Sequence, residues 1–333
     1  MAFNSFDYVL FLCIVFFAFW RLVRYPLVRV LLLLVASYAF YTVWNGWFVV
    51  LILLSTFIDL ACGYFIYKYR ERPGTRKILL ALSIIANLSI LAYFKYTNFF
   101  IDNINALIAG LGGDPALANL DIIWPVGISF YTFQSMSYTL DIYRGAIQPT
   151  RSPANFFLFV SFFPQLVAGP IVRARELLPQ LEHPPRMDPD AFGRAVYRIM
   201  RGLVKKMVLA DYLAHAMIKP VFANPELFSS VEVFVTLVAF HFHVYLDFSG
   251  YTDVALGSAG LFGFKLPENF DSPYRAATPA HFWRRWHMTL TRFVFDYLYI
   301  PMGGSRRGTF RTHLNVLLTF AVIGFWHGPN WNY

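Results

Sequence analysis

Charged side chains are scarce in this sequence. Asp, Glu, Lys and Arg make up 14% of its 333 residues, whereas a soluble globular domain usually carries about 25%. Apolar residue types account for 57% of the chain, and a soluble fold of this length could not hide so much apolar surface. The composition therefore argues against a soluble domain and predicts a protein embedded in a lipid bilayer.

Cysteine and several common site motifs are also rare or missing. The two cysteines, Cys13 and Cys62, lie inside apolar runs, so we expect them to pack there and not to form a disulfide or redox pair. We find no Gly-rich phosphate loop and no Gly-x-Ser-x-Gly motif. His243 and Asp247 have a spacing at which both could ligate one ion, but no third ligand follows. We therefore expect no metal and no bound cofactor.

The net charge of +9 does not predict nucleic-acid binding, because Lys and Arg gather in short loops between apolar runs. Residues 68–77 alone contain five of them. This distribution is typical of the positive-inside rule. It predicts that the loops after the first and third apolar runs lie in the cytoplasm and that the N-terminus lies outside.

Apolar runs of helical length predict an all-α polytopic membrane protein, with one domain over residues 1–333. We expect a loop with several acidic and almost no basic residues after residue 94, on the extracytoplasmic side. The expected apolar helices are residues 4–20, 30–44, 47–67, 78–94, 122–143, 232–246 and 314–326.

Three further segments are less regular. Residues 155–172 are apolar but interrupted by two prolines and a glycine, with basic residues at both ends, which predicts a re-entrant segment beside an internal chamber. Residues 190–213 predict an amphipathic helix on the cytoplasmic surface, and residues 281–299 predict an interfacial segment. Because the chain stops at Tyr333 soon after an apolar run, we expect further spans beyond it.

His327 is the sharpest candidate for chemistry. It follows an apolar run and lies between Trp326 and Gly328. Ionisable residues within membrane segments are costly and often functional. An imidazole can accept a proton near neutral pH, and small neighbours let a substrate approach. The spacing alone is equally compatible with an interfacial histidine that is hydrogen-bonded to a carbonyl.

Two other clusters could contribute to a site. His287 lies close in sequence to Trp283 and Arg284, and such a set could bind an anionic or thioester ligand, although an interfacial anchor helix uses the same composition. Asp247 and Asp253 enclose a polar stretch and could orient an imidazole or a substrate hydroxyl. The alternative is a helix break there, with side chains capping backbone groups.

Taken in order, several motifs make the chain resemble the membrane-bound O-acyltransferase family, and specifically its bacterial alginate O-acetyltransferase-like branch. These motifs are residues 93–99, 125–131, 141–145, 163–170, 245–253, 268–270, 282–287, 296–300 and 326–328. The resemblance implies helices around a central funnel, which an acyl thioester such as acetyl-CoA enters from the cytoplasm and an acceptor hydroxyl from the other side. His327 matches the family's catalytic histidine and His287 its second motif histidine.

The resemblance also implies a metal-free transfer of an acetyl or other acyl group to hydroxyls of an exported or cell-wall polysaccharide. His327 would act as base, and His287 with Trp283 or Arg284 would position the thioester or stabilise negative charge. Asp253 could set an imidazole tautomer, and Trp326 could help to position the donor. The expected partners are the bilayer and either an extracytoplasmic SGNH-like acetyltransferase or a polysaccharide-export protein.

Three other functions stay open. The protein could be an exporter that takes D-alanyl or acyl groups from a carrier protein, as in teichoic acid modification. It could be a transporter or a polysaccharide export channel, although the paired, inverted halves common in transporters are not visible. It could also be a non-catalytic scaffold that recruits an extracytoplasmic transferase.

Overall fold

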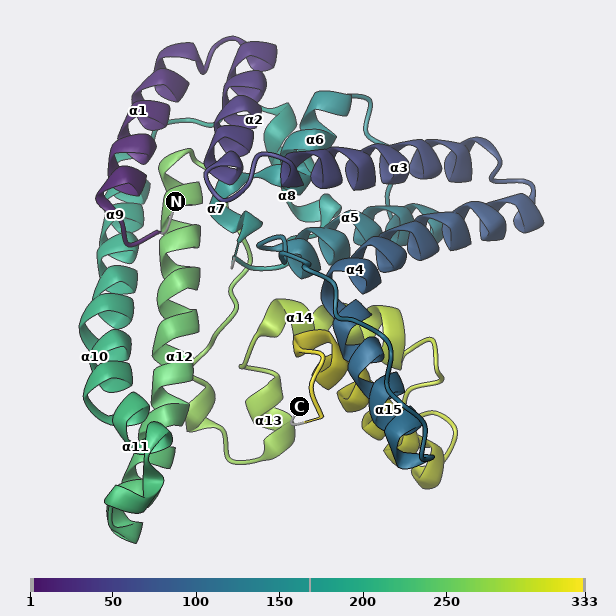
Figure 1. Cartoon of the computed structure of the whole chain (residues 1–333). Coiled ribbons are helices and arrows are strands. Elements are labelled where there is room, and N and C mark those ends of the chain that lie inside the picture. Colours follow the sequence, from purple (N-terminus) through teal and green to yellow (C-terminus); the bar gives the residue numbers. More distant parts are fainter. Residues whose placement is uncertain (1–2, 168, 332–333) are drawn as a thin grey trace. The chain divides into compact units, whose positions relative to one another are not determined.

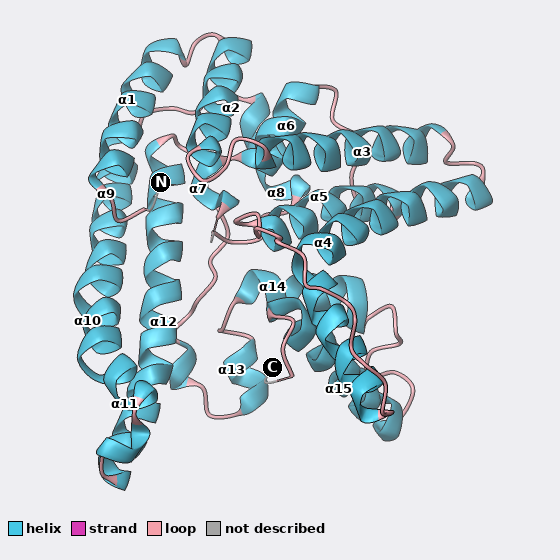
Figure 2. Cartoon of the chain, in the orientation of Figure 1, coloured by secondary structure: helices cyan, strands magenta, loops and turns pink. Residues whose placement is uncertain are grey.

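The computed structural model describes residues 3–167 and 169–331, and these residues form helices and no strands (Figures 1 and 2). The predicted all-α class is confirmed. Contacts divide the chain into two compact units that interleave in sequence. Unit 1 comprises Met1–Trp44 and Ala154–Thr289, and unit 2 comprises Asn45–Pro153 and Leu290–Tyr333. The expected single domain stays a prediction.

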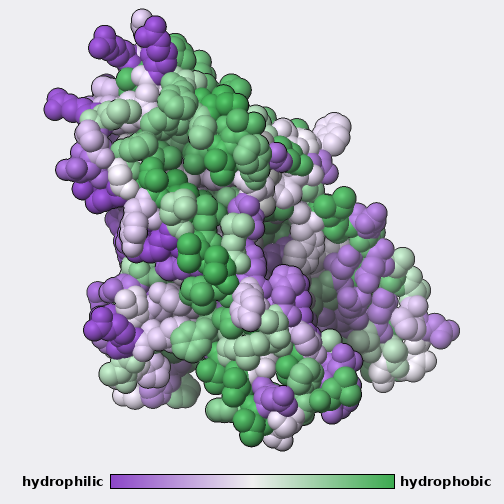
Figure 3. All heavy atoms as spheres, turned by 90° about the vertical axis from the view of Figure 1, so that its left-hand side faces the viewer, coloured by the Kyte–Doolittle hydropathy of each residue, from purple (hydrophilic) through white to green (hydrophobic). Residues whose placement is uncertain are grey.

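Among the described residues, three helices are long and apolar enough to cross a bilayer: α3 (Phe48–Lys68), α4 (Pro73–Gly110) and α12 (Ser230–Leu261). Large apolar side chains on their surfaces are exposed, including Ile78 on α4 and Phe234 on α12. Figure 3 shows hydrophobic side chains gathered over much of one face. Exposed apolar surface of this extent suits lipid, and the protein is a multi-pass membrane protein.

The remaining helices are shorter. Those at residues 4–20, 30–44 and 314–326 were predicted to within a few residues, and whether they cross the membrane stays a prediction. The shorter helices of unit 1 are α1 (Phe6–Leu22), α2 (Pro26–Thr42), α6 (Pro153–Ser161), α7 (Phe163–Leu166), α8 (Ala174–Glu182), α9 (Pro189–Leu203), α10 (Asp211–Leu213), α11 (Lys219–Ala223) and α13 (Pro279–Trp283). Those of unit 2 are α5 (Ile128–Tyr143) and α15 (Thr309–His327). Helix α14 (Met288–Val294) begins in unit 1 and ends in unit 2.

Helices α9 and α12 lie side by side in unit 1 (Figure 1). Glycines make this close approach possible, because a Cβ on Gly202 of α9 would lie 2.6 Å from the Gly250 carbonyl oxygen of α12. Two turns further along α12, a Cβ on Gly257 would lie 2.8 Å from the Ala195 carbonyl oxygen of α9. Small residues at such crossings let two helix backbones pack closely within a membrane.

The predicted helix break at residues 247–253 is wrong, because α12 runs without interruption from Ser230 to Leu261. Its acidic side chains bond to the neighbouring helix instead of capping their own backbone. Asp253 pairs with cations of α9, and Asp247 pairs with Lys206 at 2.6 Å. Polar residues that find partners across a helix interface have no reason to compete with the backbone of their own helix.

The segment 155–172 is broken, as its sequence predicts. Helix α6 ends at Ser161, and α7 restarts at Phe163 with Pro164 in its first turn, where the missing N–H of proline does no harm. Phe162 and Phe163 are fully buried, so the irregular backbone lies inside protein. The side of the membrane on which this segment begins and ends stays a prediction, as does the surface location of α9.

In unit 2, the expected loop after residue 94 is also wrong, because α4 continues to Gly110. Polar side chains on this extension bind the chain that follows. Asn98 exchanges two hydrogen bonds with the backbone of Leu120, at 2.8 and 2.9 Å, and Asn119 donates to Asp102 at 2.9 Å. The acidic loop therefore begins later and folds back along α4, and α5 starts at Ile128, after a left-handed Gly127.

A buried carboxylate joins α3, α4 and α5. Asp59 of α3 is completely buried and accepts hydrogen bonds from Ser83 at 2.5 Å and from Asn87 at 3.0 Å, both on α4. Ser135 of α5 donates to its other oxygen. Buried polar groups need such partners, because an unsatisfied acceptor inside a membrane protein is costly. The donors that the structure describes here are hydroxyl and amide groups.

Candidate active site

His327 is the last residue of α15, and residues of α4 hold this end of the helix. The last carbonyls of a helix lack partners within it. The Tyr96 hydroxyl donates to the Phe325 carbonyl at 2.8 Å, and the Lys95 ammonium donates to the Trp326 carbonyl. A cation at a helix C-terminus also interacts favourably with the helix dipole. The turn that carries His327 is therefore tied to α4.

Aromatic packing fixes the same turn. The ring of Phe325 stacks on Tyr96 with centroids 4.3 Å apart. The ring of Trp326 is buried and stacks on Phe133 of α5 at 5.3 Å. Trp326 thus packs inside unit 2 and is not one of the residues that line the cavities beside His327. Its predicted role in positioning the donor stays a prediction, and its contacts support the placement of His327.

Two cavities of about 410 and 290 Å³ meet at His327. Both are lined by Phe94, Lys95, Trp124 and His327. The larger one extends along the outer part of α4, past Asn98 and Asp102, and the smaller one extends over residues 125–130. Volumes near 300 Å³ and above are typical of small-molecule sites. An exposed imidazole between two such spaces can reach a ligand in either of them.

His287 lies in unit 1, in a turn between α13 and α14. It is buried, and its backbone is left-handed with φ 41°, a conformation that is uncommon outside glycine although histidine adopts it more readily than most residues. The edge of its ring meets Phe248 at 4.7 Å, and the next residue, Met288, donates to the Asn269 carbonyl at 2.9 Å. Neighbouring contacts thus hold a strained backbone in place, as is frequent at functional sites.

The neighbours of His287 in sequence are more accessible. Trp283 ends α13 and is 38% exposed, and Arg284 is exposed. Within residues 281–299 the structure has α13, α14 and the π-helical segment Phe295–Tyr299, and the interfacial location of these residues stays a prediction. The left-handed turn at His287 is what separates α13 from α14. The predicted donor-binding roles of His287, Trp283 and Arg284 stay predictions.

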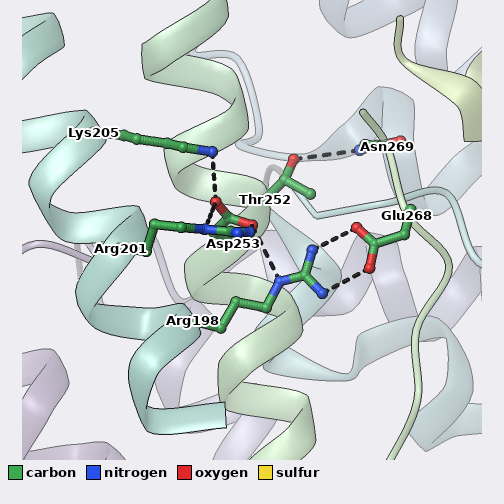
Figure 4. Close-up of polar contacts among 7 residues, drawn as sticks. All are labelled: Arg198, Arg201, Lys205, Thr252, Asp253, Glu268 and Asn269. Carbon is green, nitrogen blue, oxygen red and sulfur yellow. Dashed lines mark hydrogen bonds and ion pairs between the residues drawn. The ribbon is translucent and has the colours of Figure 1, made fainter. Parts of the chain in front are cut away.

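Asp253 lies elsewhere in unit 1, in an ion-pair cluster between α12 and α9 (Figure 4). The residue is 4% exposed, and its carboxylate accepts from Arg198 at 3.1 Å, Arg201 at 2.6 Å and Lys205 at 2.7 Å. Arg198 also forms a two-pronged pair with Glu268. These contacts support a structural role for Asp253. Its role in setting an imidazole tautomer stays a prediction that they do not favour.

The charges of this cluster reinforce one another. Burial by itself would lower the pKa of the Arg198 guanidinium, but the hydrogen bonds and charges of Glu268 and Asp253 outweigh burial and raise that pKa above its ordinary value. Arg198 therefore stays charged and holds two acids at once. The cluster therefore links α9 to α12 and to Glu268.

Among the residues that the structure describes, no group of three or more His, Cys, Asp or Glu side chains is placed to hold a metal ion. Of the pair with ligand spacing in the sequence, His243 bonds through its ring to the Ala210 carbonyl at 3.0 Å, and Asp247 pairs with Lys206. Both side chains thus have partners within unit 1.

Sequence reasoning missed Lys95 and Tyr96 as site residues. Both lie in the motif at residues 93–99, to which no chemistry was assigned. A usable signal was present, because a lysine within an apolar helix is costly and marks function by default. What the sequence could not show is that these two residues contact the helix that carries His327.

The model of the MBOAT, membrane-bound O-acyltransferase family, matches residues 146–333, more than half of the chain and the part that contains both histidines. The chain belongs to this family. The predicted resemblance is confirmed. The matched residues include His327, which lies in unit 2, and His287, which lies in unit 1.

Individual members of the family are similar over most of the chain. A probable alginate O-acetylase of Azotobacter vinelandii is 40% identical over 92% of this chain and 60% of its own length. A peptidoglycan O-acetyltransferase of Helicobacter pylori is 38% identical over 92% of this chain and 62% of its own length. A teichoic acid D-alanyltransferase of Streptococcus thermophilus is 31% identical over 62% of this chain and 53% of its own length. The chain thus spans about three-fifths of the length of the first two relatives.

Proposed function

We propose that this member of the family transfers an acyl group, most simply acetyl, from a thioester donor to hydroxyls of an exported or cell-wall polysaccharide. The observation that carries the proposal is the placement of His327, held by α4 at the meeting point of two cavities. The named activities of the alginate and peptidoglycan relatives support the acyl group and the class of acceptor.

In the proposed reaction, the His327 imidazole takes the proton of an acceptor hydroxyl as its oxygen attacks the thioester carbonyl carbon. The new carbon–oxygen bond forms, and the carbonyl oxygen becomes negative. When the carbonyl reforms, the carbon–sulfur bond breaks, and the thiolate leaves with the proton that the imidazolium returns. Positioned general-base help of this kind contributes about 10²–10⁴-fold to a rate.

The donor is acetyl-CoA or another acyl thioester that arrives from the cytoplasm, and His287 with Trp283 or Arg284 would position it. The protein would reside in the bacterial cytoplasmic membrane with its N-terminus outside. An extracytoplasmic SGNH-like acetyltransferase or a polysaccharide-export protein would pass the group onward or present the acceptor.

A second candidate is D-alanyl export from a carrier protein. It is favoured by the similarity to the Streptococcus thermophilus D-alanyltransferase, although that similarity covers less of the chain than the alginate one does. Ester-linked alanine in the cell envelope would distinguish it from acetyl transfer. Mild base releases alanine or acetate from the two kinds of ester, and chromatography separates these two products.

The test compares His327→Ala with His313→Ala. Both histidines lie on α15, but His313 is exposed and does not line either cavity, so it controls for the loss of an imidazole from the helix. Each variant is expressed from the complete gene in a deletion strain, at matched membrane abundance. Acetyl esters are then measured on exported polysaccharide and on peptidoglycan.

We expect the ester to disappear on deletion, to return with the wild type and His313→Ala, and to stay absent with His327→Ala. Full restoration by His327→Ala would contradict a role in catalysis. It would favour the scaffold or conduit function instead.

A further inference from the structure

Lys95 is a cation in the middle of the apolar helix α4. The partners that the structure describes for it are a carbonyl, a hydroxyl and two aromatic faces: it donates to the Trp326 carbonyl and to Ser129 Oγ at 3.3 Å, and its Nζ lies 5.4 Å from the centre of the Trp326 ring and 5.8 Å from that of Tyr96. The cations around Asp253, by contrast, are paired with carboxylates. A charge placed in this way keeps an electrostatic attraction for a further anion.

The ammonium of Lys95 also has an unused donor. A lysine ammonium carries three N–H groups, and the two hydrogen bonds described account for two of them. Lys95 lines both cavities that His327 lines. The third N–H group can therefore serve a ligand that occupies the same space as a substrate of His327.

Capping alone does not explain a charged residue here. Tyr96 already binds the carbonyl next to the one that Lys95 binds, using a neutral hydroxyl. A neutral donor at position 95 could satisfy the Trp326 carbonyl without the cost of an ammonium in a membrane helix. The dipole of α15 offsets part of that cost, and a reacting group that becomes negative beside Lys95 would give the charge a function.

We propose that Lys95 is a second catalytic residue, which donates a hydrogen bond to the acyl carbonyl oxygen as that oxygen becomes negative. The inference rests on the proposed acyl transfer and names the group that stabilises its intermediate. His327 takes the acceptor proton, the acceptor oxygen bonds to the carbonyl carbon, and the electron pair displaced onto the carbonyl oxygen is held by Lys95. The pair returns when the thiolate leaves, and Lys95 neither gains nor loses a proton.

The magnitude follows from comparable sites. Loss of one donor to a developing oxyanion lowers kcat by about 10²–10³-fold, because the lost donor was already oriented towards the developing charge. The ground-state thioester carries no such charge. Its KM should therefore change little when Lys95 is removed.

The experiment measures ester formation from labelled acetyl-CoA in inverted membrane vesicles of the deletion strain, with each variant expressed from the complete gene. Lys95→Met removes the charge, Lys95→Arg keeps it, and Tyr96→Phe removes only the neighbouring cap. His327→Ala is the reference for loss of the reaction. Rates are divided by the amount of folded protein, taken from detergent gel filtration.

We expect Lys95→Met to lower kcat by about 10²–10³-fold while KM for acetyl-CoA stays within about threefold. Lys95→Arg should retain at least about tenfold more activity than Lys95→Met, because the charge and the donors remain. Tyr96→Phe should cost less than about fivefold, in keeping with the loss of one neutral hydrogen bond. A further variant, Lys95→Ala, is assayed in the same vesicles with and without ethylamine, and the amine should raise its rate because a small ammonium can enter the vacated space.

Two results would overturn the inference and leave the proposed function intact. One is a kcat for Lys95→Met close to that of the wild type, with His327→Ala inactive. The other is an equal loss in Lys95→Met and Tyr96→Phe without amine rescue, which would make Lys95 a helix cap only. An active His327→Ala, or a wild type that forms no ester, would instead overturn the proposed function, and this inference with it.

Discussion

The two units of the molecule treat a buried acid in opposite ways. In unit 1, the carboxylate of Asp253 is met by three cations from the neighbouring helix and the segment after it. In unit 2, the carboxylate of Asp59 is met by hydroxyl and amide groups from two neighbouring helices. Both arrangements join helices in a membrane protein, but the first needs a negative charge and the second needs only a hydrogen-bond acceptor.

The two units also differ in what their charged side chains can do. In unit 1 the charges of Arg198, Arg201 and Lys205 are each paired with the carboxylate of Asp253, and these ion pairs hold α9 against α12. In unit 2 the described partners of Lys95 are neutral, and it lies in the cavities of His327. A charge that structure does not neutralise remains available for chemistry.

The largest expected effect comes from exchanging each acid for its amide. Asp253→Asn leaves Arg198, Arg201 and Lys205 facing one another without an anion, and we expect it to destabilise unit 1 by about 3 kcal/mol, the low end for a broken buried pair, because these cations are 21–45% exposed. Asp59→Asn keeps an acceptor oxygen and should cost about 1–2 kcal/mol.

Thermal unfolding of the two variants in the same detergent measures this difference. Equal losses of stability would mean that the charge of Asp253 contributes nothing beyond its hydrogen bonds. A larger loss for Asp59→Asn would reverse the comparison between the units.

A smaller effect tests how closely α9 and α12 approach each other. Gly202→Ala places a methyl group 2.6 Å from the Gly250 carbonyl oxygen, and we expect overpacking to cost about 1–3 kcal/mol. Gly193→Ala, on the same helix, meets nothing within 4 Å and should be neutral or stabilise by up to about 1 kcal/mol. Unfolding midpoints of the two alanine variants give the answer, and a Gly202→Ala protein as stable as Gly193→Ala would show that the helices are not in tight contact there.

The smallest effect concerns the rim of the ion-pair cluster. Glu268 is 48% exposed at its side chain, so Glu268→Gln should cost less than about 1 kcal/mol, and the cost should shrink further in high salt. Unfolding of Glu268→Gln at low and high ionic strength checks both points. A loss as large as that of Asp253→Asn would mean that Glu268 and Asp253 act as one buried unit.

Helix positions were predictable from the sequence where apolar runs were uninterrupted, as for α3, whose bounds differ by one residue at each end from the expected 47–67. Prediction failed where polar residues follow an apolar run. The polar residues 247–253 suggested a break in α12, and Lys95 and Asp102 suggested the end of α4. In both helices the polar side chains have partners on other segments, and no local pattern reveals such partners.

Composition and the spacing of apolar runs determined by themselves that this protein is helical and lies in a membrane, because lipid allows few other ways to satisfy a backbone. The motifs taken in order likewise indicated the family, whereas the catalytic role of His327 stays a prediction. Only the tertiary structure decided which charges are paired and which are not. Asp253 and Lys95 are both charges within a long apolar helix, but Asp253 contacts three opposite charges, whereas Lys95 caps the helix of His327 beside an open cavity.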